Sequence, residues 1–422
     1  MVLGLGFILL SLNTRVAFGQ LGPLAPVAGF GTGALTVLGL LPPLCMGLFA
    51  PLTPWVRRRL GEERGLFWAS VLLLAGTVVR MAGLPGLFVG TVLVSIATAV
   101  VNVLIPVFVR SRFAPRRVGV MMGVYALSMG AGSALVAALM VPVWQASGHS
   151  WQTAIGVAVV PAALAAIGIA PQVRGSGASA PQVRGSGVSA SQTPARVRSG
   201  SVGQQGQEGQ EGQERQEGQE GQEGQEGPQR QQGREGQQGR GLVWSLTAYF
   251  GLQTLLFYTT LAWLPAILVD AGVTGATAGN MQAVFIVGVA VGGFLTPVLA
   301  AARTDQRPHL LGIVLVCAGG YAGLLAAPAA APALWAVVLG IGLGGGQAVA
   351  GVLYVKRGKD HEHVAALSTV AQTGGYLLAA AGPVTASVLH TMTGTWTVPL
   401  VVFLGVLLLS VVASLRAGHD RP

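Results

Sequence analysis

The stretch LGLGFILLSLNTRVAFGQLGPLAPV, residues 3–27, decides the fold class of this chain. It is apolar nearly throughout, and its 25 residues are enough to cross a bilayer as a helix, because about 20 apolar residues span ~30 Å of hydrocarbon. Arg15 lies in its middle. A fixed positive charge at that depth costs roughly 2.5–3.5 kcal/mol on insertion scales, and arginine cannot avoid this cost by losing its proton. We therefore expect Arg15 to face protein or water and to meet hydrogen-bond acceptors there.

The composition of the whole chain indicates a polytopic membrane protein. Of its 422 residues, 52% are hydrophobic and 9% are charged, whereas a soluble domain carries about 25% charged residues. The mean hydropathy is +0.62. The length therefore counts membrane spans rather than soluble domains. Cys45 and Cys317 both lie in apolar segments, so no disulfide framework is expected.

The hydropathy pattern predicts an all-α membrane protein with twelve transmembrane helices in two six-helix repeats. The first six spans are expected at 3–27, 33–56, 65–83, 86–109, 118–142 and 151–170. The second six are expected at 243–268, 277–301, 309–327, 332–355, 364–389 and 397–415. Residues 1–170 and 242–422 are thus predicted as two bundles joined by residues 171–241.

Basic residues predict the orientation of these spans. Of the 25 Lys and Arg residues, 23 lie in alternate connections, in residues 171–241 or after the last span, and the opposite connections hold none. By the positive-inside rule, both termini are expected in the cytoplasm. The net charge of +10 is then a topology signal, and nucleic acid is not expected as a partner.

The segment 171–241 differs in composition from the rest of the chain. It repeats PQVRGSG at 171–177 and 181–187, and then repeats GQE between Gly206 and Gly227. With eight Arg, eight Glu and almost no large apolar side chains, it cannot offset its ordering entropy. We expect a disordered, low-complexity cytoplasmic linker.

The two halves repeat each other. A shift of 245 positions carries Arg58 to Arg303, Asn102 to Gln347, Arg112 to Arg357 and Trp151 to Trp396. These pairs fall at like places in like spans. Six spans followed by six spans, both entering from the same side, is the parallel-repeat arrangement known in transporters.

Arg15 is the first candidate for a substrate-binding residue, because small residues share its helix face. Gly19, Gly22 and Pro26 follow it at i+4, i+7 and i+11 and leave room for a cavity. No carboxylate lies within any predicted span to neutralise the guanidinium. This pattern favours an anionic ligand, although Arg15 could instead only tie helices together through backbone carbonyls.

Polar side chains deep in four other spans are further candidates. Asn102 and Gln347 are equivalent in the repeat and lie near the middle of their spans, where amides bind ligands or link helices for about 0.6 kcal/mol on average. The side chains of the seventh and eleventh spans could donate hydrogen bonds to a ligand. The candidate substrate-binding residues besides Arg15 are Asn102, Gln253, Tyr258, Gln347, Gln372 and Tyr376.

The sequence does not indicate an enzyme, a metal site or a cofactor. The run KDHEH at 359–363 resembles a metal motif, but two histidines at i and i+2 do not share a helix face. No nucleophile–base pair occurs within the predicted spans. Arg80 lies near the outer end of the third span, where we expect its side chain to extend to the membrane surface.

Three strings resemble a known family. LNTR…GPLAP in the first span, GLQTLLFYTTLAWLPAIL in the seventh and QTGGYLLAAAGP…TGTW in the eleventh are similar to the cyanate permease and 2-nitroimidazole transporter group of the major facilitator superfamily. The resemblance covers both halves and omits only residues 171–241. It implies alternating access with a solute held between the halves. Carried over residue by residue, it involves Arg15, Gln253, Tyr258, Gln372 and Tyr376.

One superfamily signature departs from its usual form. After the second span the superfamily has Gly-x-x-x-Asp-Arg-x-Gly-Arg-Arg, where this chain has PWVRRRLGEE at 54–63. Arg58 stands where Asp is expected, and Glu62 and Glu63 stand where basic residues are expected. The charges are partly inverted, so the usual ion pairs of the inner gate cannot be transferred to this chain.

We expect a secondary active transporter that moves a small polar or anionic, cyanate-like solute across the cytoplasmic membrane, with Arg15 as its counter-charge. An alternative is a multidrug or nitroimidazole-type exporter, which predicts a promiscuous cavity lined by aromatics and methionines, with Arg15 buried against protein. A third is a receptor or scaffold that uses residues 171–241 for partners. The expected partners are the solute and the lipid bilayer, and the chain is expected to be a monomer.

Overall fold

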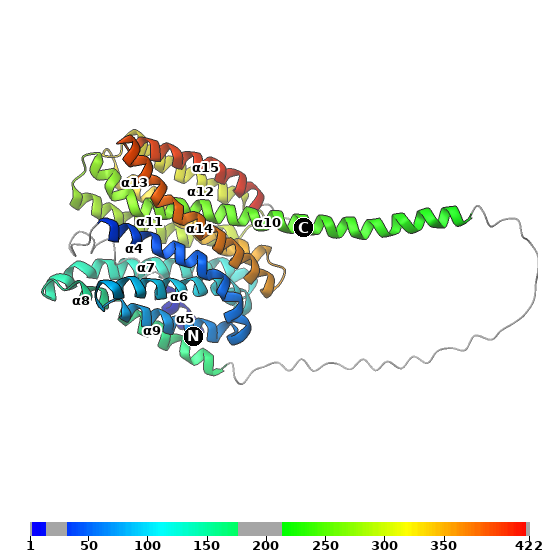
Figure 1. The fold of residues 1–422 in the computed structure, drawn as a ribbon, viewed down its shortest axis with the longest axis horizontal. Helices are drawn as coiled ribbons and strands as arrows, with labels where there is room; N and C mark the ends of the chain where they lie inside the picture. The colour runs from blue at the N-terminus through cyan, green and yellow to red at the C-terminus, as the bar shows by residue number, and fades with distance from the viewer. Residues whose placement is uncertain (1, 14–31, 176–212, 419–422) are drawn as a thin grey trace, which may run out of the picture. The chain divides into compact units, whose positions relative to one another are not determined.

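The structure, a computed structural model, describes residues 2–13, 32–175 and 213–418 (Figure 1). Its long elements are all α-helices, and these residues contain no β-strand. Of the described residues, 2–13, 32–175 and 242–418 belong to one compact unit, and 213–241 belong to a second. The two repeats of the sequence therefore share one unit.

The first half of the chain, over residues 2–13 and 32–175, supplies α-helices and two short 3-10 turns. A 3-10 turn, η1 (Ala50–Leu52), separates α4 from α5, and a second, η2 (Pro115–Arg117), precedes α7. The α-helices are α1 (Val2–Asn13), α4 (Thr32–Phe49), α5 (Thr53–Val79), α6 (Gly83–Arg112), α7 (Val118–Ala146), α8 (Trp151–Gly156) and α9 (Val159–Gly175).

Within residues 213–418 the second half supplies six long helices. Apart from the start of α10, their bounds follow the predicted spans within a few residues, because each span is an apolar run that ends near Gly, Pro or charged residues. They are α10 (Gln213–Asp270), α11 (Gly275–Ala301), α12 (Arg307–Ala326), α13 (Pro332–Arg357), α14 (His361–Thr393) and α15 (Thr397–Ala417).

Ten segments within the described ranges are long and apolar enough to cross a membrane. One of them, Val37–Val79, has 43 residues and would measure ~65 Å as a straight helix, about twice the hydrocarbon thickness. Gly61 interrupts it with φ 78° and ψ 177°, so the run accommodates two of the expected spans. Of the first expected span only Gly4–Asn13 is described as an apolar helix. The count of twelve and the cytoplasmic termini stay predictions.

The structure describes only part of the segment 171–241, and the expectation that this segment is a disordered linker stays a prediction. Residues 213–241 are helical and continue into the apolar part of α10. Residues 176–212 lie outside the described part of the chain.

Glycines set the close packing of α11 on α13. A Cβ at Gly340 or Gly344 would overlap backbone atoms of Phe285 or Val289, and a Cβ at Gly292 would overlap the Ile341 carbonyl. Without these Cβ atoms the two backbones approach directly, which is how small residues stabilise helix pairs in membranes. The glycine-rich run GIGLGGGQ therefore serves helix packing.

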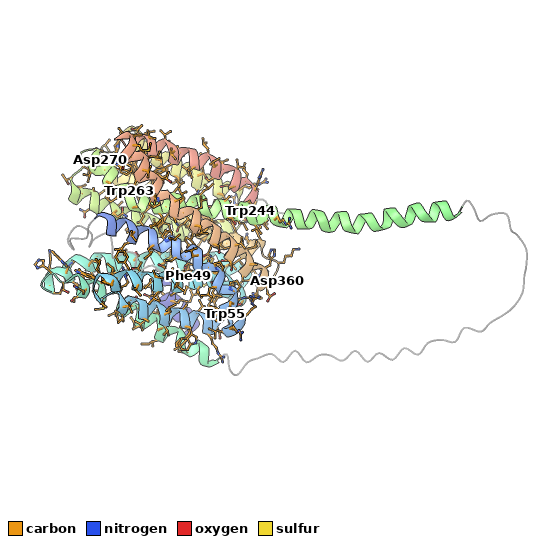
Figure 2. The ribbon with its side chains drawn as sticks, viewed as in Figure 1. Phe49, Trp55, Trp244, Trp263, Asp270 and Asp360 are labelled. Carbon is orange, nitrogen blue, oxygen red and sulfur yellow. The ribbon has the colours of Figure 1, made fainter. Side chains whose placement is uncertain are left out.

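The two halves meet along α7 and α11 and along α4 and α14 (Figure 1). A Cβ at Gly123 would lie 2.8 Å from the Phe294 carbonyl oxygen, and one at Gly47 would lie 2.9 Å from the Leu377 nitrogen. Figure 2 shows Trp55 and Asp360 toward one end of the unit and Trp263 and Asp270 toward the other. Arg57, Arg58 and Arg59 follow Trp55 in the chain, so we call the end near Trp55 the basic end.

Candidate solute-binding site

A cavity of about 60 Å³ lies between the two halves. Its walls come from α6 and α7 of the first half and from α10, α11, α13 and α14 of the second. None of the described residues that line it is charged. Its polar lining consists of Asn102, Tyr125, Gln347, Tyr354, Gln372 and Tyr376. Its larger apolar lining consists of Met122, Met129 and Phe250.

Asn102 is the centre of the hydrogen bonds at this cavity. Its amide oxygen accepts from the Tyr125 hydroxyl at 2.5 Å. Its amide nitrogen donates to the Tyr376 hydroxyl at 3.0 Å and approaches the Met46 sulfur at 3.8 Å. Tyr125 belongs to the first half and Tyr376 to the second. Asn102 therefore links the halves and fixes two phenol rings at the cavity wall.

Pro106 explains a second link between the halves. It lies inside α6, four residues after Asn102, and proline has no N–H to donate to the Asn102 carbonyl. That carbonyl instead accepts a hydrogen bond of 3.0 Å from the Gln372 amide nitrogen of α14. The same nitrogen also donates to the Ser368 hydroxyl at 2.8 Å. The proline thus exposes a backbone acceptor that a side chain of the other half satisfies.

Aromatic rings form the wall of the cavity on the second half. Phe250 packs edge-on against Tyr376 with a centroid distance of 5.1 Å and against Tyr354 with a centroid distance of 6.5 Å. Tyr354 is buried, and its hydroxyl has no hydrogen-bond partner among the described residues. Such a wall offers flat apolar faces together with hydroxyl groups at their edges.

The structure brings four of the seven expected residues to this cavity, namely Asn102, Gln347, Gln372 and Tyr376. Gln253 and Tyr258 are buried in the second half but do not line it. Gln253 packs against Gly346, and neither atom of its amide has a hydrogen-bond partner within the described ranges. Arg15 lies outside the described residues.

Sequence reasoning missed Tyr125, Tyr354, Phe250 and the two methionines. A signal was present, because Tyr354 follows Gln347 by seven residues and so extends its helix face by two turns. Met122, Tyr125 and Met129 likewise share one face of α7. Met122, Tyr125, Phe250 and Tyr354 lie toward the basic ends of their spans, whereas the predicted residues are polar side chains nearer the middle.

The expectation that Arg80 extends to the membrane surface is wrong. Its side chain is 0% exposed. Arg80 ends α5, and a Cβ at Gly90 of α6 would lie 2.5 Å from the Arg80 Cγ. Because Gly90 has no side chain, the Arg80 side chain has space to pack against α6 inside the first half. Arg80 does not line the cavity between the halves.

At the basic end, arginines of the first half bind the turn between α13 and α14. Arg110 donates to the carbonyl of Val355 at 2.5 Å and to that of Lys359 at 3.0 Å. The last carbonyls of a helix lack intrahelical partners and carry partial negative charge, so a guanidinium suits them. Arg57 also pairs with Glu362 at 3.3 Å.

Asp360 caps α14 in the same turn. The backbone N–H of His363 donates to its carboxylate at 2.7 Å, and this hydrogen bond lowers the pKa of Asp360. The His363 ring accepts from the Lys359 backbone N–H at 3.2 Å. These groups of the KDHEH run therefore serve the start of a helix.

The family model described as Major Facilitator Superfamily matches residues 3–383. The chain belongs to this superfamily. Three relatives span nearly its whole length. It is 31% identical to the uncharacterized transporter YycB of Bacillus subtilis strain 168, over 99% of this chain and 93% of that one. It is 30% identical to the 2-nitroimidazole transporter of Escherichia coli K12, over 100% and 96%.

The third relative is the cyanate transport protein CynX of Escherichia coli K12, at 23% identity over 92% of this chain and 90% of that one. Among solved structures, the fold resembles the fucose:proton symporter FucP of Escherichia coli. That match has a TM-score of 0.63 at 12% identity and covers 98% of each chain. The resemblance to the superfamily is thus confirmed, and the protein is a multi-pass membrane protein of the major facilitator type, a superfamily of transporters that are generally not enzymes.

Proposed function

We propose that the protein is a secondary transporter that moves a small polar solute across the cell membrane by alternating access. The observation that carries this proposal is the cavity between the halves, which is lined by both of them and by the repeat-related amides Asn102 and Gln347. Relatives along the whole chain are named as transporters of small solutes, which supports it. We expect the protein to act as a monomer in the cytoplasmic membrane.

A small anion is one candidate for the solute. The relative CynX is named for cyanate, and a guanidinium at Arg15 would bind such an anion by charge-assisted hydrogen bonds. This candidate depends on Arg15, because the described lining of the cavity holds no charged side chain. It predicts that binding of cyanate disappears when the charge at residue 15 is removed.

A nitroimidazole-type solute is the second candidate, and the lining of the cavity favours it. Phe250, Met122 and Met129 lie beside three tyrosines at the cavity. Aromatic rings and polarizable thioethers are suited to flat, weakly polar ring compounds. The relative of Escherichia coli at 30% identity is named for 2-nitroimidazole.

Uptake into proteoliposomes tests the proposal and separates the two solutes. Purified protein is reconstituted, loaded with unlabelled cyanate or 2-nitroimidazole, and assayed for counterflow of the labelled compound. We expect exchange above protein-free liposomes, and we expect it to fall when Asn102 is replaced by Leu. No exchange of any compound in a broader panel of small polar solutes, with correctly inserted protein, would remove the transporter proposal and favour the scaffold alternative.

A further inference from the structure

The amide of Gln372 has only one orientation that fits its surroundings. One end of this amide faces the backbone carbonyl of Asn102 at 3.0 Å, and a carbonyl oxygen can only accept. The group at that end must therefore be the NH₂ group, which also reaches the Ser368 hydroxyl at 2.8 Å. Both donors of Gln372 are thus used within the protein.

The other end of the same amide is an unused acceptor. The Gln372 Oε1 atom is buried and has no hydrogen-bond partner within the described ranges, and the side chain as a whole is 4% exposed. Gln372 lines the cavity between the halves. The sequence suggested that Gln372 could donate a hydrogen bond to a ligand, whereas the structure leaves only its oxygen for that purpose.

A buried acceptor without a partner imposes a condition on whatever fills the cavity. A solute that brings an N–H or O–H group satisfies Oε1, whereas a bare anion leaves it unpaired and adds repulsion between two partial negative charges. Tyr354 lines the same cavity with a hydroxyl that also lacks a partner among the described residues and can donate to the solute. Among the described residues, two in the cavity wall thus carry an unpaired acceptor and an unpaired donor.

We propose that Gln372 is the acceptor that makes this cavity select an uncharged solute with an N–H or O–H donor over a simple anion. The inference rests on the proposed transport function and narrows its solute. The cavity of about 60 Å³ restricts the solute to a small molecule. Its aromatic wall favours a flat ring. Together these features describe a small heterocycle with a ring N–H.

A matched pair of probes tests the hydrogen bond to Gln372. Binding of 2-nitroimidazole and of 1-methyl-2-nitroimidazole to the purified protein is measured by calorimetry, because the second compound differs by replacing the ring N–H with N–CH₃. We expect the wild type to bind the N–H compound about tenfold more tightly, as loss of one hydrogen bond to a buried acceptor implies. We expect cyanate to bind more weakly than the N–H compound.

Substitution of Gln372 by Met removes the acceptor at nearly constant side-chain length. In Gln372→Met we expect the ratio between the two nitroimidazoles to fall toward one. Gln282→Met is the matched control, since Gln282 lies on α11, donates to the Leu261 carbonyl at 2.8 Å and does not line the cavity. Its ratio should equal that of the wild type. Size-exclusion profiles and unfolding temperatures show whether each variant is folded.

The wild-type measurement alone can overturn the inference if Gln372→Met does not fold. Equal binding of the two nitroimidazoles, tighter binding of cyanate than of 2-nitroimidazole, or no binding of 2-nitroimidazole would each overturn it. An unchanged ratio in folded Gln372→Met would assign the selectivity to another residue and would overturn it as well. Failure of the transport proposal is distinguishable, because it appears as absent exchange in proteoliposomes whatever the binding ratio is.

Discussion

The amide nitrogen of Asn102 lies 3.0 Å from the hydroxyl oxygen of Tyr376, and this hydrogen bond joins the two halves of the chain at the cavity. Asn102 is the donor in this bond. Its amide oxygen accepts from the Tyr125 hydroxyl at 2.5 Å, so the amide nitrogen is the group that faces Tyr376. A solute that enters the cavity therefore meets phenol groups held in place by one amide. Any movement of the halves apart at this level must break the bond.

The first prediction concerns the strength of this link. Asn102→Leu removes both hydrogen bonds of the amide side chain and should lower solute affinity and thermal stability, since unsatisfied buried hydroxyls cost about 1–3 kcal/mol. Tyr376→Phe should cost less. In a double-mutant cycle the two substitutions should couple by about 0.6 kcal/mol or more, the average for polar pairs in membrane proteins. Strictly additive losses in unfolding free energy would contradict a direct link.

The second prediction concerns Pro106. In Pro106→Ala the new backbone N–H can donate to the Asn102 carbonyl and complete the helix, so it competes with the Gln372 amide. We expect equal or higher thermal stability but a smaller preference for 2-nitroimidazole over its N-methyl analogue. Binding calorimetry measures the preference. Pro142→Ala is the control, because Pro142 lies inside α7 with an exposed side chain away from the cavity.

The third prediction concerns Arg15. If the solute is an anion, Arg15→Lys should weaken transport and Arg15→Gln should abolish it. Cyanate should then protect the wild type against heat, by RT ln(1 + [L]/Kd), and should not protect Arg15→Gln. If the solute is the neutral heterocycle argued above, Arg15→Gln should keep its nitroimidazole preference. Thermal shifts with each compound separate the two outcomes. Protection of Arg15→Gln by cyanate would exclude Arg15 as the anion-binding group.

The positions of Asn102 and Gln347 could be predicted because two independent patterns agree on them. Hydropathy places both near the middle of a span, and the shift of 245 residues relates them. Helix bounds were predictable for the same reason, since apolar runs end at charged residues and prolines. Gln253 could not be placed, because a span that is apolar on all sides gives no preferred face. Its burial away from the cavity depends on how α10 is rotated.

The role of Gln372 was beyond the sequence because it depends on a partner in the other half. The missing N–H of Pro106 was visible in the chain, but the identity of the group that satisfies the Asn102 carbonyl was not. Arg80 is a similar case, because its burial depends on the space left by Gly90 on the next helix. Residues that act through contacts between distant helices leave no local pattern.

The last prediction concerns the contact between Arg110 and the end of α13. Arg110 and Val355 are equivalent positions in the repeat, separated by 245 residues, and the guanidinium of one donates to the carbonyl of the other at 2.5 Å. Arg110→Gln should loosen closure at the basic end, because a neutral amide interacts more weakly with the partial charge of a helix end. The readout is maleimide labelling of Ala348→Cys at the cavity, with Cys45 and Cys317 replaced by Ala.

Labelling from the basic side should be faster in Arg110→Gln than in the unsubstituted background. Arg112→Gln is the matched control, because Arg112 pairs with Glu63 of its own half and not across the interface. Removing either arginine lowers the positive charge of the last turn of α6 by one, so a general electrostatic effect on the reagent would change both rates equally. A faster rate in Arg110→Gln alone assigns the closure to the contact with Val355 and Lys359, whereas equal rates would show that this contact does not hold the basic end shut.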